Sequence, residues 1–249
     1  MASDAHPACR IALVTGASRR VGRAIALELA GAGCDVAVHY HRSEAPAAAV
    51  RAEIEAHGRR AVVVRADLEE PDAVDRLIAD VVAGLGGVDI LVNNASSFER
   101  MALDETDAGR WRRTLAVNTV APALLARAVA AVMRRRGGGH IINLIDTLAD
   151  RAVKGYMAYI ASKAALSAVT RCLALELAPQ ITVNGIAPGI AEFPEDYDQA
   201  TREKLIAKVP LRRAGSPADI ARLVRFLATE GGYITGAIIP VDGGRSIRP

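Results

Sequence analysis

A short apolar strand, a glycine-containing turn and a long apolar helical pattern follow one another directly at the start of the chain. Residues 10–14 form the apolar run, and residues 15–22 read Thr-Gly-Ala-Ser-Arg-Arg-Val-Gly. Gly16 permits a tight turn, and Gly22 lets the following helix pack close to the sheet. The helix N-terminus offers free N–H groups to a pyrophosphate. This order predicts a fold built around a nucleotide-binding strand–turn–helix unit.

Strand-length apolar runs alternate with helical patterns along the rest of the chain. We expect strands near residues 10–14, 35–40, 60–65, 88–92, 139–145, 181–186 and 236–240. We expect helices near residues 20–32, 44–57, 71–84, 106–136, 157–178, 197–207 and 217–228. Such alternation is typical of crossover units, so we predict an α/β fold with a doubly wound parallel sheet of the Rossmann type.

Length and composition favour one soluble catalytic domain over residues 10–249. The chain has 249 residues, of which 51% are apolar, and no internal repeat or linker divides it. We expect residues 1–9 to form a flexible tail, because they lack the apolar core of a signal peptide. No stretch is expected to have the apolar length that spans a bilayer.

The charge balance argues against nucleic-acid binding. The 31 basic and 28 acidic residues give a net charge of +3, and aromatic residues are only 4% of the chain. The basic run 134–136 is interpreted as a solvated helix C-terminus. Cys9, Cys34 and Cys172 have neither metal nor redox spacing, so we expect reduced thiols, no metal site and a cytoplasmic location.

Tyr159 and Lys163 lie four residues apart in a helical pattern and should share one face. A Lys ammonium beside a phenol favours the phenolate, so we expect a lowered Tyr159 pKa and a usable proton donor. Asp146 ends the apolar run 140–145 and can face the same pocket. An ordinary pair on a helix surface is the alternative interpretation of Tyr-x3-Lys alone.

Further motifs accompany these residues in a characteristic order. Asn93-Asn94-Ala95-Ser96 follows an apolar run, Asn118 lies within a helical pattern, and Pro188-Gly189 follows a strand. Together with the glycine turn and Tyr159/Lys163, they make the chain resemble the short-chain dehydrogenase/reductase family over residues 10–245. The resemblance implies a reductase in which Tyr159 donates the proton and Lys163 tunes it and binds the cofactor ribose. It also implies that Asn118 holds a water linking Lys163 to solvent, unless it simply satisfies a backbone group.

The segment after the second expected strand favours NADPH over NADH. It reads His39-Tyr40-His41-Arg42-Ser43 and has no carboxylate to bind a ribose diol. Arg42 can form a fork to a 2′-phosphate, His41 and Ser43 can add donors, and Arg19 can approach the same phosphate. The alternative is that Arg42 is a solvated loop residue. The resemblance adds a larger set of cofactor-binding residues: Gly16, Arg20, Val21, Asp67, Leu68, Asn94, Ala95, Ser96, Tyr159, Lys163, Pro188 and Gly189. Among these it implies that Asp67 and Leu68 receive the adenine edge and that Pro188 and Gly189 line the nicotinamide side.

Two positions depart from the pattern of most family members. Arg20 replaces the third glycine of the turn, and Asp146 replaces a Ser. Both exchanges, together with the strings 39–43 and 93–98, resemble the pteridine reductase branch of the family. The resemblance implies that the chain reduces a pterin or dihydropterin at a ring C=N bond, with dihydrofolate as a further candidate substrate.

Pterin chemistry gives each exchanged residue a role. A carboxyl at Asp146 can hold a proton for the ring nitrogen, and burial would raise its pKa. Phe98 can sandwich a flat heterocycle against the nicotinamide, or else be a core or lid aromatic. Arg20 can span from the cofactor phosphate to the pterin edge, or clamp the phosphate alone. With Ser96 and Tyr159, these residues form the expected substrate site.

Two other functions remain open from the sequence. One is an NADPH-dependent carbonyl or 3-oxoacyl reductase of the same family, and the other is a non-catalytic NADPH-binding sensor. The acidic segment 191–198 is interpreted as a substrate lid or, alternatively, a plain surface loop. The family usually forms tetramers through its long helices, so we expect a homotetramer, with Ala161, Ala164, Ala165 and Ala168 permitting close helix packing.

Overall fold

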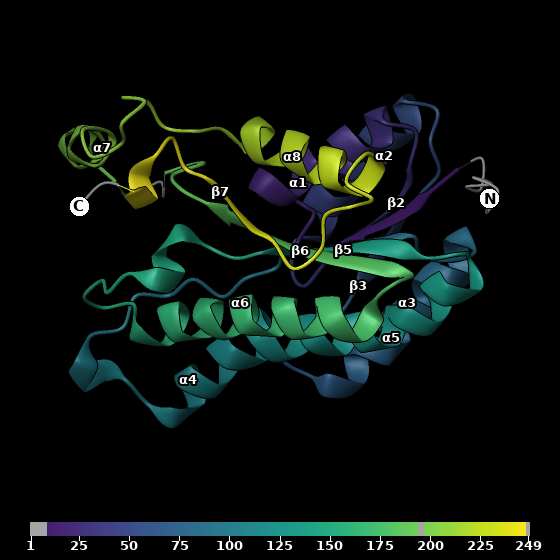
Figure 1. The fold of residues 1–249 in the computed structure, drawn as a ribbon, viewed down its shortest axis with the longest axis horizontal. Coiled ribbons are helices and arrows are strands. Elements are labelled where there is room, and N and C mark those ends of the chain that lie inside the picture. Colours follow the sequence, from purple (N-terminus) through teal and green to yellow (C-terminus); the bar gives the residue numbers. More distant parts are fainter. Residues whose placement is uncertain (1–8, 194–196, 248–249) are drawn as a thin grey trace.

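In the computed structural model, a seven-stranded parallel sheet has helices on both faces (Figure 1). The structure describes residues 9–193 and 197–247. Nearly all of the expected N-terminal tail therefore lies outside the described residues. The strand order is β3-β2-β1-β4-β5-β6-β7, so the order reverses direction between β1 and β4. The predicted doubly wound α/β fold is confirmed.

All seven expected strands are present, each within two residues of its predicted start. Their bounds are β1 Ile11–Val14, β2 Asp35–Tyr40, β3 Ala61–Arg65, β4 Ile90–Asn93, β5 Gly139–Leu144, β6 Ile181–Pro188 and β7 Ile238–Val241. Short apolar runs predict them well because parallel strands are buried on both faces.

The expected helices are present as well. Their bounds are α1 Arg20–Gly31, α2 Glu44–Ala56, α3 Pro71–Leu85, α4 Ala108–Leu115, α5 Ala121–Arg135, α6 Met157–Leu177, α7 Gln199–Ile206 and α8 Pro217–Thr229. Three short 3₁₀ turns lie at Leu103–Glu105, Thr147–Asp150 and Arg245–Ile247. A π-helical turn, Ala116–Val120, joins α4 to α5.

Two apolar cores lie on opposite faces of the sheet. Helices α1, α2 and α8 cover one face, and α3, α5 and α6 cover the other (Figure 1). Successive strand residues alternate between the two cores, so Leu13 packs under α3 and α5 whereas Val14 packs under α1 and α8. Both side chains are fully buried.

The helical run Ala108–Arg135 corrects one expectation. It is 28 residues long, and an 18-residue stretch within it has a mean hydropathy of 1.7, so it is apolar enough to cross a membrane by length and composition. In the fold this run packs against α3, α6 and β5, and Leu125, Val129 and Met133 are fully buried. Its inward face therefore belongs to the core. The cytoplasmic location remains a prediction.

The strand ends place the predicted motifs together. The glycine turn follows β1, residues 94–98 follow β4, and Asp146 lies just beyond β5. These three strands are neighbours around the point where strand order reverses, which is where open α/β sheets bind ligands.

Candidate active site and cofactor cleft

Asp146 and Tyr159 form a direct hydrogen bond at the end of β5. The Tyr159 Oη donates to Asp146 Oδ2 at 2.7 Å. The other carboxylate oxygen, Oδ1, accepts from the Leu148 N–H at 2.8 Å and caps the 3₁₀ turn that follows β5. Tyr159 comes from the first turn of α6 and is 5% exposed. The two residues therefore meet as expected, and the carboxyl is held by the backbone.

Burial sets the protonation of this pair. It raises the pKa of Asp146, as expected, despite the opposing effects of the Leu148 N–H, the phenol and Lys163. The expected lowering of the Tyr159 pKa is wrong. Burial raises the Tyr159 pKa well above 10, and the Asp146 carboxylate raises it further. A phenol facing a carboxylate resists ionisation because both would then carry negative charge.

Lys163 lies beside the pair, fully enclosed by protein. Its Nζ donates to the Leu144 carbonyl at 2.7 Å and lies 5.8 Å from the centroid of the Tyr159 ring. Burial lowers the Lys163 pKa to about 8, although Asp146 acts in the opposite direction. Lys163 is thus mostly protonated at neutral pH and lies near the phenol, as the sequence predicts.

Asn118 connects the loop after β4 to α6. It lies in the π-helical turn, where its Oδ1 accepts from the Ser97 N–H at 2.7 Å and from Ser96 Oγ at 3.2 Å. Its Nδ2 donates to the Ser97 carbonyl at 2.9 Å and to Ser162 Oγ at 3.0 Å. These contacts fit the alternative that Asn118 satisfies backbone groups. Its link to Lys163 through water stays a prediction.

Three aromatic rings cluster beside the Asp146–Tyr159 pair, and we call them the aromatic wall. Phe98 stacks on Tyr156 with centroids 5.0 Å apart, and it meets Tyr159 edge-on at 4.7 Å. Phe98 is 50% exposed, so it lies at the rim and outside the core. Sequence reasoning did not select Tyr156. Its position three residues before Tyr159 on a helical pattern was the signal that could have found it.

The glycine turn is packed tightly against the loop after β4. Gly16 has a φ of +63°, and a Cβ at Gly22 would lie only 2.2 Å from the Gly16 carbonyl oxygen. The Asn94 side chain donates to the carbonyls of Thr15 and Gly16 at 2.8 and 3.1 Å. The predicted roles of both glycines in the turn are therefore supported by the backbone. Asn94 holds the turn itself.

The start of α1 is open to an anion. No side chain caps this 12-residue helix, whose N-cap is Arg19. The adjacent Arg42 is exposed and, among the described residues, has no hydrogen-bonding or ionic partner. Free N–H groups and unpaired guanidinium groups are the ligands that phosphates prefer. The chain's own residues therefore fit a phosphorylated dinucleotide.

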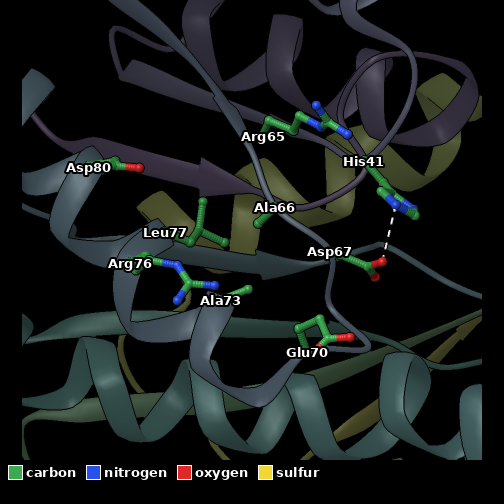
Figure 2. A pocket seen from close by; sticks show the side chains of 9 residues that line it. All are labelled: His41, Arg65, Ala66, Asp67, Glu70, Ala73, Arg76, Leu77 and Asp80. Carbon is green, nitrogen blue, oxygen red and sulfur yellow. Dashed lines mark ion pairs between the residues drawn. The ribbon is translucent and has the colours of Figure 1, made fainter.

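His41 and Asp67 contact each other at the ends of β2 and β3. Figure 2 shows the imidazole directed toward the carboxylate, with His41 Nε2 3.2 Å from Asp67 Oδ2. Both side chains line a pocket of about 330 Å³ between these strand ends and α3. The structure thus brings together a residue expected at the 2′-phosphate and one expected at the adenine.

Arg20 has an unusual backbone and an unexpected partner. Its φ of +53° lies in the left-handed region, which explains why a glycine suits this position in other family members. Its Nε lies 2.7 Å from Glu192 Oε2, and both side chains are about half exposed. Glu192 belongs to the segment expected to form a lid, of which residues 194–196 lie outside the described residues.

The end of β6 closes the other side of the cleft. The Pro188 carbonyl accepts from Thr147 Oγ1 at 3.1 Å, which ties β6 to the turn that begins at Asp146. A Cβ at Gly189 would lie 2.7 Å from Asp242 Cβ, so the strand passes very close to the C-terminal segment. Pro188 and Gly189 therefore lie near the pocket, as expected for the nicotinamide side.

Comparison with known proteins reveals close similarity over almost the whole chain. A family model described as "Enoyl-(Acyl carrier protein) reductase" matches residues 16–246. The 3-oxoacyl-[acyl-carrier-protein] reductase of Synechocystis is 37% identical over 238 residues, which cover 94% of this chain and 96% of that protein. The corresponding reductase of Staphylococcus epidermidis is 38% identical over 237 residues, covering 94% and 97%.

A solved structure gives the same result. A blue fluorescent protein from a metagenomic library, crystallised in complex with NADPH, matches with a TM-score of 0.89 and 39% sequence identity. The match covers 95% of this chain and 97% of that protein. The solved relative shares the fold, and the two curated relatives are named as 3-oxoacyl-[acyl-carrier-protein] reductases, not as pteridine reductases.

Proposed function

Because the chain belongs to the short-chain dehydrogenase/reductase family, we propose that this oxidoreductase uses NADPH to reduce a pterin or dihydropterin at a ring C=N bond. The observation that carries the proposal is the 2.7 Å hydrogen bond from Tyr159 to the buried Asp146 carboxyl. Burial raises the pKa of this carboxyl, and a carboxyl with a raised pKa is more useful for protonating a ring nitrogen than for polarising a ketone.

NADPH is supported by the uncapped start of α1, the exposed Arg42 and the NADPH complex of the similar protein. The N–H groups of the turn would hold the pyrophosphate, and Arg42 with Ser43 would hold the 2′-phosphate. The bound cofactor supplies the hydride. Lys163 is near enough to Tyr159 to act on both the phenol and the cofactor ribose.

The proton would leave from the Asp146–Tyr159 pair. After hydride reaches the ring carbon, the adjacent nitrogen becomes basic and takes the phenolic proton of Tyr159. The 2.7 Å separation of Tyr159 Oη and Asp146 Oδ2 would let a proton taken up by Asp146 from solvent pass to the phenolate, and burial favours that uptake by raising the Asp146 pKa. Lys163 stabilises the transient negative charge because its ammonium lies beside the ring.

The aromatic wall suits a flat heterocycle. Phe98 presents an exposed ring at the rim, and its stacking on Tyr156 fixes the plane against which a substrate ring can lie. The guanidinium of Arg20 can reach the substrate edge if it leaves Glu192. Ser96, bonded to Asn118, would complete the substrate site.

A second function, reduction of a 3-oxoacyl group or another carbonyl, is favoured by the names of the relatives, which support it better than they support pterin reduction. In that reaction Tyr159 would donate to the carbonyl oxygen, and Asp146 would take the place of the usual Ser. A non-catalytic sensor is the weakest interpretation, because the family is one of oxidoreductases and the Tyr159–Lys163 pair is intact and buried.

A panel of substrates separates these functions. NADPH oxidation is followed with dihydrobiopterin, biopterin and dihydrofolate in parallel with acetoacetyl-CoA and a simple ketone. We expect turnover with the pterins, and we expect Tyr159→Phe to abolish most of it while leaving NADPH binding intact. The matched control is Tyr233→Phe, which removes the hydroxyl of a fully exposed tyrosine. Turnover of acetoacetyl-CoA alone would establish the carbonyl function instead.

A further inference from the structure

His39 makes contacts that join three separate strand ends. It is the fifth residue of β2 and is 2% exposed. The Gly16 N–H donates to His39 Nδ1 at 3.1 Å, and His39 Nε2 lies 3.2 Å from the Ala66 carbonyl oxygen. Its own carbonyl accepts from the Ala17 N–H at 2.9 Å. The imidazole therefore bridges the glycine turn after β1 and the segment after β3.

These partners define the chemical state of the ring. Nδ1 faces an N–H donor and must be an acceptor, whereas Nε2 faces a carbonyl oxygen and must carry the hydrogen. A protonated ring would direct a second donor at the Gly16 N–H. Burial favours the neutral form and lowers the His39 pKa to about 4, with a smaller lowering from His41 and an opposing effect of Asp67.

The bridged segments are the two that would contact the pyrophosphate and the adenine of the cofactor. Gly16 begins the turn expected to hold the pyrophosphate, and Ala66 directly precedes Asp67, which is expected at the adenine. Figure 2 shows Ala66 and Asp67 as neighbours beside the pocket that His41 also lines. A side chain that fixes the distance between these segments acts on the cofactor without touching it.

We propose that His39 is a positioning residue for NADPH, which as the neutral Nε2–H tautomer holds the glycine turn in register with the adenosine-binding end of the sheet. The proposal rests on the proposed use of NADPH. It differs from the roles expected of His41, Arg42 and Ser43, which would touch the phosphate themselves. The imidazole acts through the backbone of Gly16.

Two substitutions separate the contacts of the imidazole. His39→Asn retains an acceptor, Oδ1, at the same number of bonds from Cα as Nδ1, so it can still accept from Gly16. His39→Leu fills the space and leaves the Gly16 N–H without an acceptor. An unpaired buried donor is costly, so we expect about tenfold weaker NADPH binding in His39→Leu. His39→Asn keeps the Gly16 contact and loses the one to Ala66, so we expect an intermediate effect, with NADPH binding about threefold weaker.

Direct binding measurements test the proposal with two probes. NADPH spans both bridged segments, whereas adenosine 2′-monophosphate contacts the adenosine end alone. We expect every variant to bind adenosine 2′-monophosphate within about twofold of wild type. Wild-type affinity for NADPH in His39→Leu, or a parallel loss of both ligands, would overturn the positioning role. A wild-type protein that binds adenosine 2′-monophosphate but prefers NADH would instead contradict the proposed cofactor.

A measurement on the unaltered protein covers the case in which His39→Leu does not fold. Nitrogen-15 NMR of the histidine rings at neutral pH reports which ring nitrogen carries the hydrogen. We expect His39 to have a protonated Nε2 and an unprotonated Nδ1, and we expect NADPH to leave that state unchanged. A His39 ring protonated at Nδ1 would overturn the proposal.

Discussion

At the scale of single residues, the pocket around Tyr159 is arranged to retain protons. Burial raises the pKa values of both Asp146 and Tyr159, while Lys163, with a pKa of about 8, keeps a positive charge at neutral pH. Because Tyr159 Oη and Asp146 Oδ2 are hydrogen-bonded, a proton can pass between these two oxygen atoms. Such a pair can replace the proton that the substrate takes, which is the step pterin reduction requires.

The pH dependence of turnover follows from these shifts. At a pH above the raised Asp146 pKa, the Asp146–Tyr159 pair carries a negative charge and gives up a proton less readily. The kcat for pterin reduction should therefore fall as pH increases. A further fall is expected near pH 8, where Lys163 loses its charge. In Asp146→Asn the residue cannot ionise, so only the fall due to Lys163 should remain, and it should move below pH 8 because the charge of Asp146 no longer raises the Lys163 pKa. Values of kcat measured from pH 5 to 9.5 check this, and a wild-type rate that rises over this range would contradict it.

Arg42 provides the second prediction at this scale. The loss of a charge-assisted contact to the 2′-phosphate costs about 1.5–3 kcal/mol, so Arg42→Ala should raise the KM for NADPH roughly tenfold or more. The KM for NADH should hardly change. Arg51→Ala is the matched control, because Arg51 lies on α2 and pairs with Glu55. Equal losses with both cofactors would show that Arg42 does not recognise the 2′-phosphate.

The sequence predicted most of the site residues but not their electrostatics. Helical spacing put Tyr159 and Lys163 on one face, and the strand-end position of Asp146 together with the accompanying motifs predicted that it meets them. The predicted lowering of the Tyr159 pKa was wrong. This pKa depends on burial and on the distance to Asp146, and the spacing of residues in the sequence gives neither. Tyr156 was missed for a similar reason, since its importance comes from contact with a loop residue 58 positions away.

At the scale of elements, periodicity was sufficient for the strands and long helices. The expected helix over 106–136 is one continuous run, but the π-helical turn around Asn118 was not predicted. Such turns depend on packing against neighbouring elements rather than on local propensity. The short 3₁₀ turn capped by Asp146 was missed likewise, because its three to four residues have no periodic pattern.

The close approach of the glycine turn and α1 gives a prediction for an element. Gly22→Ala would place a methyl group 2.2 Å from the Gly16 oxygen and 2.5 Å from Asn94 Nδ2, so the turn must shift. We expect a Tm roughly 2–10 °C lower and clearly weaker NADPH binding. Gly31→Ala on the same helix meets nothing within 4 Å and should leave both quantities near wild type. Thermal melting and NADPH titration of both variants test this prediction, and equal Tm and affinity in Gly22→Ala and Gly31→Ala would contradict it.

At the scale of the whole molecule, the exposed face of α6 has features that favour packing against a second copy of the chain. Ala164 and Ala168 are exposed one turn apart, and Leu175 on the same helix is 84% exposed. Small exposed residues let two helices approach closely. Covering the exposed leucine with a second chain would remove apolar surface from water, which favours association. These features support the proposed homotetramer, in which α6 packs against a second copy.

Light scattering after size exclusion tests this assembly. The wild type should have about four times the 26.2 kDa mass of one chain. Ala168→Glu places a charge in the proposed interface and should give a smaller species, whereas Ala48→Glu, at an exposed position of α2, should leave the mass unchanged. A wild-type mass of one chain, or no effect of Ala168→Glu, would contradict assembly through α6.

The central claim is that Asp146 adapts this family's proton relay to a ring C=N bond. The most direct test compares kcat/KM of wild type and Asp146→Ser on dihydrobiopterin and on acetoacetyl-CoA, with NADPH saturating. We predict that the substitution lowers pterin turnover by roughly ten- to a thousand-fold and creates or improves turnover of the ketone, because Ser and Tyr159 can then share a carbonyl oxygen. A wild-type enzyme that is fast on acetoacetyl-CoA, inert to pterins and indifferent to Asp146→Ser would contradict the claim.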